Sequence, residues 1–159
     1  MVIFLLLVIN LLTFWHYYFY FNKKSVTFEN GAKIMVEVAD NEYKQEQGLS
    51  DKKSIPDNFG LLFPLAGRQP VFWMKEMNFS LDYIWVKNDL IVDIDRQVPI
   101  KDAQDNWTSN ITAAVDYPDY VIEIKAGFCE RNKIDVGQKV FININSNMNA
   151  CIDKKKFLE

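Results

Sequence analysis

Residues 81–96 read LDYIWVKNDLIVDIDR. Two apolar runs, Leu81–Val86 and Leu90–Arg96, lie on either side of the polar triplet Lys87-Asn88-Asp89. Strand-length runs rich in β-branched and aromatic residues, joined by a short polar connection, are typical of an antiparallel β-hairpin. We therefore begin from a fold built on antiparallel strands.

The flanking sequence repeats this strand pattern on both sides of the hairpin. Apolar and polar residues alternate with a period of two, or form short apolar runs, in the segments Ser25–Asn30, Ala32–Asp40, Phe59–Pro64, Gln69–Met74, Tyr120–Lys125 and Val136–Ile144. Strands this short and this numerous favour a barrel or a sandwich.

Within residues 25–159, two segments have a helical pattern. Asn41–Gly48 is polar, with Asp40 or Asn41 as a candidate N-cap and Gly48 as its end, and Gly127–Lys133 is long enough for one or two turns. The sequence thus predicts an α+β domain, mostly antiparallel β, with one or two short helices. Pro99–Asn110 is predicted to be a long polar loop.

Charge and composition exclude some classes of function. The chain has 159 residues and a net charge of -3. Lys23 and Lys24 are the only charged residues among the first 24, so residues 25–159 carry about -5. An acidic domain is a poor candidate for nucleic-acid binding. The single histidine, His16, and the two cysteines, Cys129 and Cys151, supply too few ligands for a zinc site, and we expect neither metal nor cofactor. A Cys129–Cys151 disulfide and two unpaired thiols both remain open.

The N-terminal segment Val2–Phe21 is almost wholly apolar and ends in aromatic residues before the two lysines. Twenty helical residues span a bilayer core, and Trp and Tyr favour its interfaces. We therefore expect residues 1–24 to be a single membrane anchor and residues 25–159 to be one domain. A removed signal peptide and a buried core helix are the alternatives, and for the signal peptide no basic start or A-x-A site is present.

Several short motifs occur in a recognisable order. They are Gln47-Gly48-Leu49, Gly60-Leu61-Leu62-Phe63, Phe72-Trp73-Met74-Lys75, Leu81-Asp82, Tyr120-Val121-Ile122-Glu123, Ala126-Gly127 and Val136-Gly137. Together, over about Ile34 to Ile144, they resemble the family called domain of unknown function 192. The resemblance implies a small barrel-like β domain without an assigned activity. Many relatives look exported, which favours an extracytoplasmic domain, whereas Lys23 and Lys24 favour the cytoplasm.

The chain departs from the family pattern at two places. Glu76 and Met77 stand where relatives usually have Asn-Thr, and Leu49-Ser50 stands where Leu-Met is usual. Methionine cannot form the hydrogen bonds of threonine, so any role of that polar pair is altered here.

Two carboxylates are candidates for catalysis. Asp82 and Glu123 could act as the acid and base of a hydrolase if they share a cleft. The structural alternative is that Asp82 accepts backbone N–H bonds at a turn, while Glu123 faces water or pairs with Lys75 or Arg131. The domain lacks the histidine that usually activates a nucleophile, so Cys129 is expected to be a buried small apolar residue.

Aromatic residues supply the candidate binding residues. Trp73, with Lys75 beside it, and Trp107 in the polar stretch 105–108 are predicted to contact a ligand. Phe72 and Trp85 are predicted to fill the core. The sequence therefore favours a membrane-anchored, non-catalytic module that binds a small ligand, a glycan or a protein, over a hydrolase or a purely structural subunit.

Overall fold

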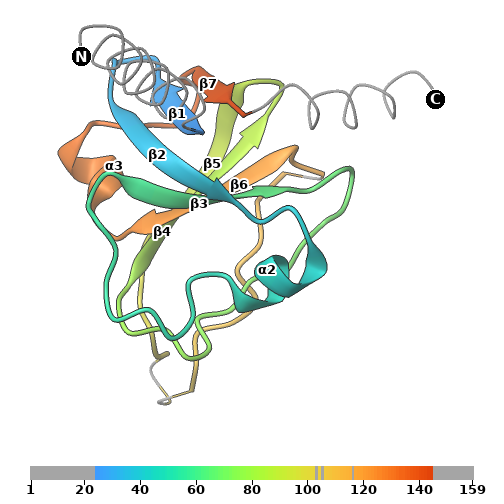
Figure 1. The fold of residues 1–159 in the computed structure, drawn as a ribbon, viewed down its shortest axis with the longest axis vertical. Helices are drawn as coiled ribbons and strands as arrows, with labels where there is room; N and C mark the ends of the chain where they lie inside the picture. Colours follow the sequence, from blue (N-terminus) through green and yellow to red (C-terminus); the bar gives the residue numbers. More distant parts are fainter. Residues whose placement is uncertain (1–23, 103, 105, 116, 145–159) are drawn as a thin grey trace, which may run out of the picture.

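In the computed structural model, which describes residues 24–102, 104, 106–115 and 117–144, seven strands form one sheet (Figure 1). The strands are β1 (Ser25–Phe28), β2 (Lys33–Val38), β3 (Phe59–Pro64), β4 (Leu81–Lys87), β5 (Leu90–Val98), β6 (Tyr120–Lys125) and β7 (Val140–Asn143). Their order across the sheet is β5-β4-β6-β3-β2-β1-β7. Every named pair is antiparallel except β2 with β3. The predicted α+β fold with mostly antiparallel strands is confirmed.

The sheet curls until its two edge strands approach each other. The Ile91 N–H donates to the Gln138 carbonyl at 2.9 Å, and the Val140 N–H donates to the Asp89 carbonyl at 2.9 Å. Leu90 and Lys139 form an isolated bridge between the same edges. Because these bonds are few, the sheet is a half-barrel whose edges meet at one end. This agrees with the prediction of a barrel-like domain.

The predicted hairpin at residues 81–96 is the β4–β5 pair. Asn88 and Asp89 both have positive φ, 51° and 60°, as the tight turn between right-twisted strands demands. β1 and β2, on either side of Gly31, also pair antiparallel as a hairpin.

Both faces of the sheet are covered. One cluster, which includes Leu62, Ile84 and Ile122, fills the inside of the curl. A second cluster, which includes Leu61, Tyr83 and Trp85, lies on the opposite face, and α2 (Glu42–Gln47) and the long connections cover it (Figure 1). Central strands buried on both faces lose the alternation seen in half-exposed strands, and β4 is buried from Leu81 to Val86.

The two short helices occur where the sequence predicts them. The side chain of Asn41 caps α2 by accepting from the Lys44 N–H at 3.0 Å, and Gly48 ends the helix with φ of 53°. The second helix, α3 (Phe128–Arg131), begins after Gly127.

One predicted strand is wrong. Gln69–Met74 runs over the outer face and makes only an isolated bridge, between Phe72 and Ile111. Pro70 has no N–H to donate to a ladder, so this segment pairs at one point instead of extending the sheet.

The predicted anchor Val2–Phe21 and residues 145–159 lie outside the described residues. Among the described residues, no helix has the length and apolar character needed to cross a bilayer.

Candidate functional site

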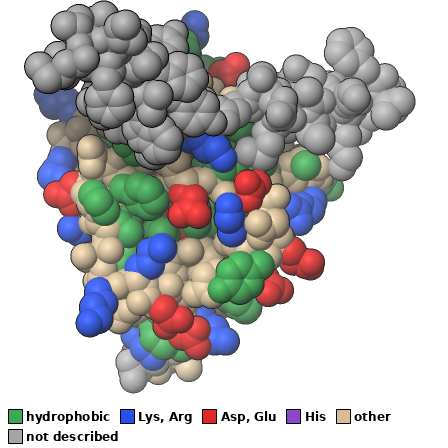
Figure 2. Space-filling view, viewed as in Figure 1, with side chains coloured by type: hydrophobic (Ala, Val, Ile, Leu, Met, Phe, Trp, Pro, Cys, Tyr) green, Lys and Arg blue, Asp and Glu red, His purple; other side chains and the backbone are tan. Residues whose placement is uncertain are grey.

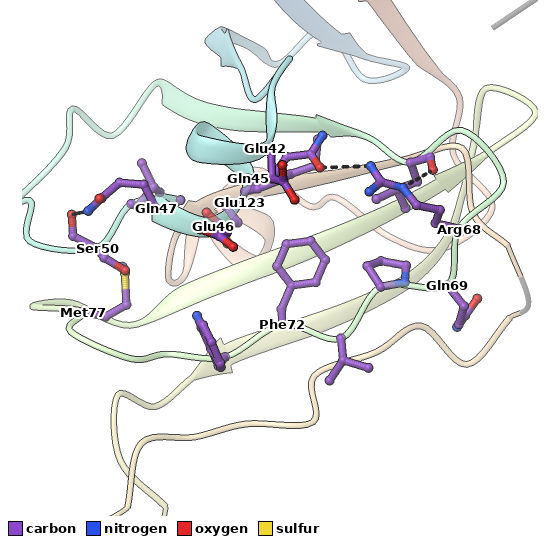
Figure 3. A pocket seen from close by; sticks show the side chains of 17 residues that line it. Glu42, Gln45, Glu46, Gln47, Ser50, Arg68, Gln69, Phe72, Met77 and Glu123 are labelled. Atoms are coloured by element: carbon purple, nitrogen blue, oxygen red, sulfur yellow. Dashed lines mark hydrogen bonds between the residues drawn. The ribbon is translucent and has the colours of Figure 1, made fainter.

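A pocket of about 440 Å³ opens on the outer face of the sheet, between α2 and the segment that follows β3 (Figure 3). Its lining combines acidic and amide side chains of α2, apolar side chains of the β3–β4 connection, and one carboxylate from β6: Glu42, Gln45, Glu46, Gln47, Gly48, Leu49, Ser50, Phe63, Leu65, Arg68, Gln69, Pro70, Val71, Phe72, Trp73, Met77 and Glu123.

Glu123 lies at the bottom of this pocket. In the sheet it pairs with Leu61 of β3 and Tyr83 of β4, so its side chain points to the outer face. It is 4% exposed, and its Oε2 has no hydrogen-bond partner among the described residues. A Cβ placed on Gly48 would lie 3.5 Å from this oxygen, so the glycine leaves open the space beside it.

Burial changes the acidity of this group. Desolvation raises the pKa of Glu123 to about 8, and a hydrogen bond from Tyr83 acts in the opposite direction. The pKa of Tyr83 is raised as well, first by burial and then by the negative charge of Glu123. The Tyr83 hydroxyl also lies 3.3 Å from the sulfur of Met74. The bottom of the pocket thus holds a carboxyl group that is protonated at neutral pH when nothing pairs with it.

The charged groups at the pocket mouth are mostly acidic. Glu42 and Glu46, both exposed, lie on the side of α2 that lines the pocket. Arg68 is the basic residue of the lining, and its guanidinium donates to the Gln45 side chain at 2.9 Å and to the Leu65 carbonyl at 3.2 Å (Figure 3). Both acceptors are uncharged, so Arg68 keeps its positive charge, and the carboxylates of Glu42 and Glu46 outnumber it in the lining.

An aromatic cluster supports the opposite wall. The Phe72 ring lies 5.0 Å from Phe63, 5.5 Å from Tyr83 and 5.6 Å from Trp85, measured between centroids. This packing fixes the segment that carries Trp73, whose side chain is 56% exposed. The wall is therefore packed against the aromatic cluster at Phe72 and exposed at Trp73.

The predicted binding residues are only partly brought together. Trp73 lines the pocket, whereas Lys75 lies in a neighbouring groove with its Nζ 5.8 Å from the Trp73 ring. Trp107 is in the loop between β5 and β6, outside the lining, with the Lys101 Nζ 3.9 Å from its ring. Trp73 is thus the member of this set that the structure places in the pocket.

The structure does not bring the two candidate carboxylates into one cleft. Asp82 pairs with Ile124 and points to the inner face, opposite to Glu123. Its oxygens accept from the N–H groups of Gln97 at 2.8 Å, Gly127 at 3.2 Å and Cys129 at 2.9 Å. Asp82 thereby holds the start of α3 and a residue of β5 against β4, which is a structural arrangement.

Cys129 is fully buried and forms no disulfide within the described part of the chain. Burial, and after it the nearby Asp82 carboxylate, raises the pKa of this thiol. Cys151 lies outside the described residues, so the predicted alternatives for the pair stay predictions. Within the described part of the chain, no group of three or more His, Cys, Asp or Glu residues is placed to hold a metal ion.

The model of the family DUF192, described as "Uncharacterized ACR", matches residues 25–142. The chain belongs to this family. The resemblance drawn from the motifs is thereby confirmed, and this DUF192 domain covers nearly all of the described residues.

Solved structures share the DUF192 fold of this chain. A protein of unknown function from Novosphingobium aromaticivorans DSM 12444 is 26% identical, with a TM-score of 0.63, and the match covers 75% of this chain and 83% of that one. A "putative transcription regulator" from Sinorhizobium meliloti 1021 is 23% identical, with a TM-score of 0.64, over 77% and 95% of the two chains. The similarity to the second protein shows a shared fold and nothing about function. No curated protein matches the chain.

Sequence reasoning missed the depth of Glu123 in this DUF192 domain. Its alternation in YVIEIK indicated a polar residue facing water or a basic partner, yet α2 and the β3–β4 connection cover that face. A weak signal was present: α2, the helix that ends at Gly48 in the pocket lining, is polar and has no buried residue. A helix of that kind covers a face of the sheet without packing buried side chains against it, which leaves room for a pocket.

Proposed function

We propose that this DUF192 protein is a non-catalytic binding module whose ligand occupies the pocket between α2 and the β3–β4 connection. The observation that carries the proposal is the buried Glu123 carboxyl, whose Oε2 has no hydrogen-bond partner among the described residues and lies in the pocket lining. Buried polar groups in native proteins are nearly always hydrogen-bonded, so an exception calls for an explanation. A ligand that supplies the missing partner is such an explanation.

The shape and composition of the pocket support this proposal. Its volume falls within the range of small-molecule sites, and apolar walls with a few convergent polar groups are typical of them. The hydrolase alternative needs Asp82 and Glu123 across one cleft, and their placement on opposite faces gives it no support.

Ligand screening of the full-length chain tests the proposal. Thermal shift and intrinsic fluorescence would be read against a library of amines, sugars, nucleosides and short peptides. Trp85 is a suitable reporter because its ring lies 5.6 Å from Phe72 of the pocket wall.

Two tryptophan variants show where a hit binds. Trp73→Ala removes an exposed ring of the lining and is expected to weaken a hit by about 1 kcal/mol, which is about fivefold in affinity. Trp107→Ala removes an exposed ring outside the lining and is expected to leave the affinity unchanged. A library without hits, or equal losses in the two variants, would contradict the proposal.

We also propose that Val2–Phe21 anchors the module to a membrane, with the domain on the extracytoplasmic side. The apolar length of this segment supports the first part, and the resemblance to a family of which many members look exported supports the second. Membrane fractionation tests the first part. Protease digestion of a C-terminal tag in intact cells tests the second, and a tag protected from external protease would contradict it.

A further inference from the structure

We infer that the ligand of this pocket is an organic cation, a primary amine on an apolar body, whose ammonium group pairs with Oε2 of Glu123. This inference rests on the proposed binding function and names the chemical class of the ligand. Its starting point is the contrast between a deeply buried acidic group and an open pocket that leads to it.

The free oxygen of Glu123 defines the polar end of the ligand. Apart from the Tyr83 hydroxyl, which bonds to Glu123, the outer face around it is apolar: Leu61 flanks it in the sheet, and Phe63 lies near Gly48 on the same side. A carboxylate in such surroundings is stabilised by a hydrogen-bond donor that carries positive charge, more than by a neutral donor.

The charges around Glu123 favour a cation over an anion. Glu42 and Glu46 of α2 line the same pocket, and Arg68 donates its bonds to protein acceptors. Figure 3 shows the α2 carboxylates and Glu123 on one side of the pocket and Phe72 facing them from the other. An anionic ligand would meet the negative charges of Glu42 and Glu46, whereas a cation is attracted by both and by Glu123 once that carboxyl is ionised.

The apolar walls define the rest of the ligand. Leu49, Phe63, Leu65, Phe72 and Met77 are mostly buried and present hydrocarbon to the pocket. The exposed ring of Trp73 adds an aromatic face at the opening, and such faces attract cations as well as apolar groups. A hydrated inorganic cation would gain nothing from these walls, so the ligand has a hydrocarbon part.

On the face of the molecule seen in Figure 2, acidic and basic side chains are interspersed, and neither charge dominates. The acidic character is therefore a property of the pocket and not of the whole surface in view.

Proton release distinguishes this ion pair from a neutral contact. The titratable and charged groups that face Glu123 are Tyr83 of β4, Glu42 and Glu46 of α2, and Arg68 of the β3–β4 connection. Burial raises the pKa of Glu123 to about 8, so in the empty pocket at neutral pH the carboxyl holds a proton. Pairing with an ammonium group requires the ionised form, so the carboxyl proton passes to solvent on binding. The affinity should therefore rise by up to about tenfold per pH unit as the pH approaches 8.

The test uses three probes of one shape and different charge: benzylamine, benzyl alcohol and phenylacetate. Isothermal titration calorimetry of the full-length chain is performed at about pH 6, 7 and 8, in two buffers of different ionisation enthalpy so that released protons are counted. We expect benzylamine to bind about tenfold or more tightly than the other two at pH 8, with release of nearly one proton at pH 6 to 7.

Variants assign the effect to Glu123. Glu123→Gln should lose both the preference for benzylamine and the pH dependence. Glu46→Gln, at an exposed position of the mouth, should weaken benzylamine about twofold without changing proton release, and it serves if Glu123→Gln fails to fold. Glu37→Gln removes the same charge on β2, outside the pocket, and should have no effect.

The failures of the two proposals are distinguishable. If benzyl alcohol or phenylacetate binds as tightly as benzylamine, if no proton is released, or if Glu123→Gln keeps the preference for the amine, the cation inference is wrong. If none of the probes binds but an uncharged or anionic library compound binds in a Trp73-dependent way, the cation inference also fails and the binding function stands. If nothing binds at all, both proposals fail.

Discussion

Replacing Glu123 by glutamine should change how the stability of the protein depends on pH. In the folded chain the pKa of Glu123 is about 8, against an ordinary value of 4.5. Between these two values the folded state binds one more proton than the unfolded state. Stability therefore falls as pH rises through this window, and the loss is complete above pH 8.

The magnitude follows from the two pKa values. At 1.36 kcal/mol per pH unit, the difference between 4.5 and about 8 corresponds to about 5 kcal/mol. Rearrangement around an ionised side chain lowers that figure, so we expect Glu123→Gln to gain between about 2 and about 5 kcal/mol over the wild type from pH 5 to pH 9. That is a large part of the total stability of a domain of this size.

Urea unfolding of the full-length chain, followed by tryptophan fluorescence at both pH values, measures the effect. The difference between the two proteins is the relevant quantity, because the titration of Cys129 is common to both and burial, the first cause, keeps the pKa of Tyr83 raised in both. Glu37→Gln, at an exposed position of β2, is the matched control and should change the pH dependence by less than about 0.5 kcal/mol. A stability difference between wild type and Glu123→Gln that is the same at pH 5 and pH 9 would refute the reasoning.

Two further substitutions test the fold around the pocket. Asp82→Ala leaves three backbone N–H groups without their acceptor and should lower the free energy of unfolding by about 3–5 kcal/mol in urea titrations. The control Asp57→Asn breaks only an exposed ion pair with Lys125 and should lower it by less than about 1 kcal/mol. Similar losses in the two variants would mean that Asp82 has no structural role. Gly60→Ala places a Cβ 2.8 Å from the Glu123 carbonyl and should lower the free energy of unfolding by about 2–3 kcal/mol, seen as a lower melting temperature. Gly31→Ala, in an open turn with φ of 88°, should lower it by about 1–2 kcal/mol. The reverse order of the two losses would contradict the described β3–β6 packing.

The hairpin and the lone strand Tyr120–Lys125 could be predicted because their local patterns agree with the fold. Residues 81–96 carry both the strand-forming side chains and a turn that tolerates positive φ. Gly48 and Asn41 likewise mark the ends of α2 by their own chemistry. In these segments the interactions that define the structure lie between residues close in sequence.

The pocket could not be predicted from local patterns, since it depends on which segment covers the outer face. The alternation of Tyr120–Lys125 correctly assigns Glu123 to the face opposite Ile122, but it cannot show that α2 and Phe72 lie over that face. For the same reason the composition of Gln69–Met74 suits a strand, yet the segment forms a wall of the pocket. Its apolar side chains pack on the second cluster, while its backbone makes only an isolated bridge to another segment. Residues more than twenty positions apart had to be brought together before the site existed.

Asp82 and Glu123 are two buried acids on adjacent strands, and their difference argues for function at the second. Asp82 accepts three N–H bonds, so its burial is compensated by contacts that hold α3 in place. Glu123 is covered almost as fully, yet one of its oxygens has no partner among the described residues. If Glu123 served only the fold, a nonpolar side chain of similar volume would be less costly to bury. The free-energy cost of burying the Glu123 carboxyl is better explained by a ligand that completes its hydrogen bonds, because destabilising groups of this kind concentrate at functional sites.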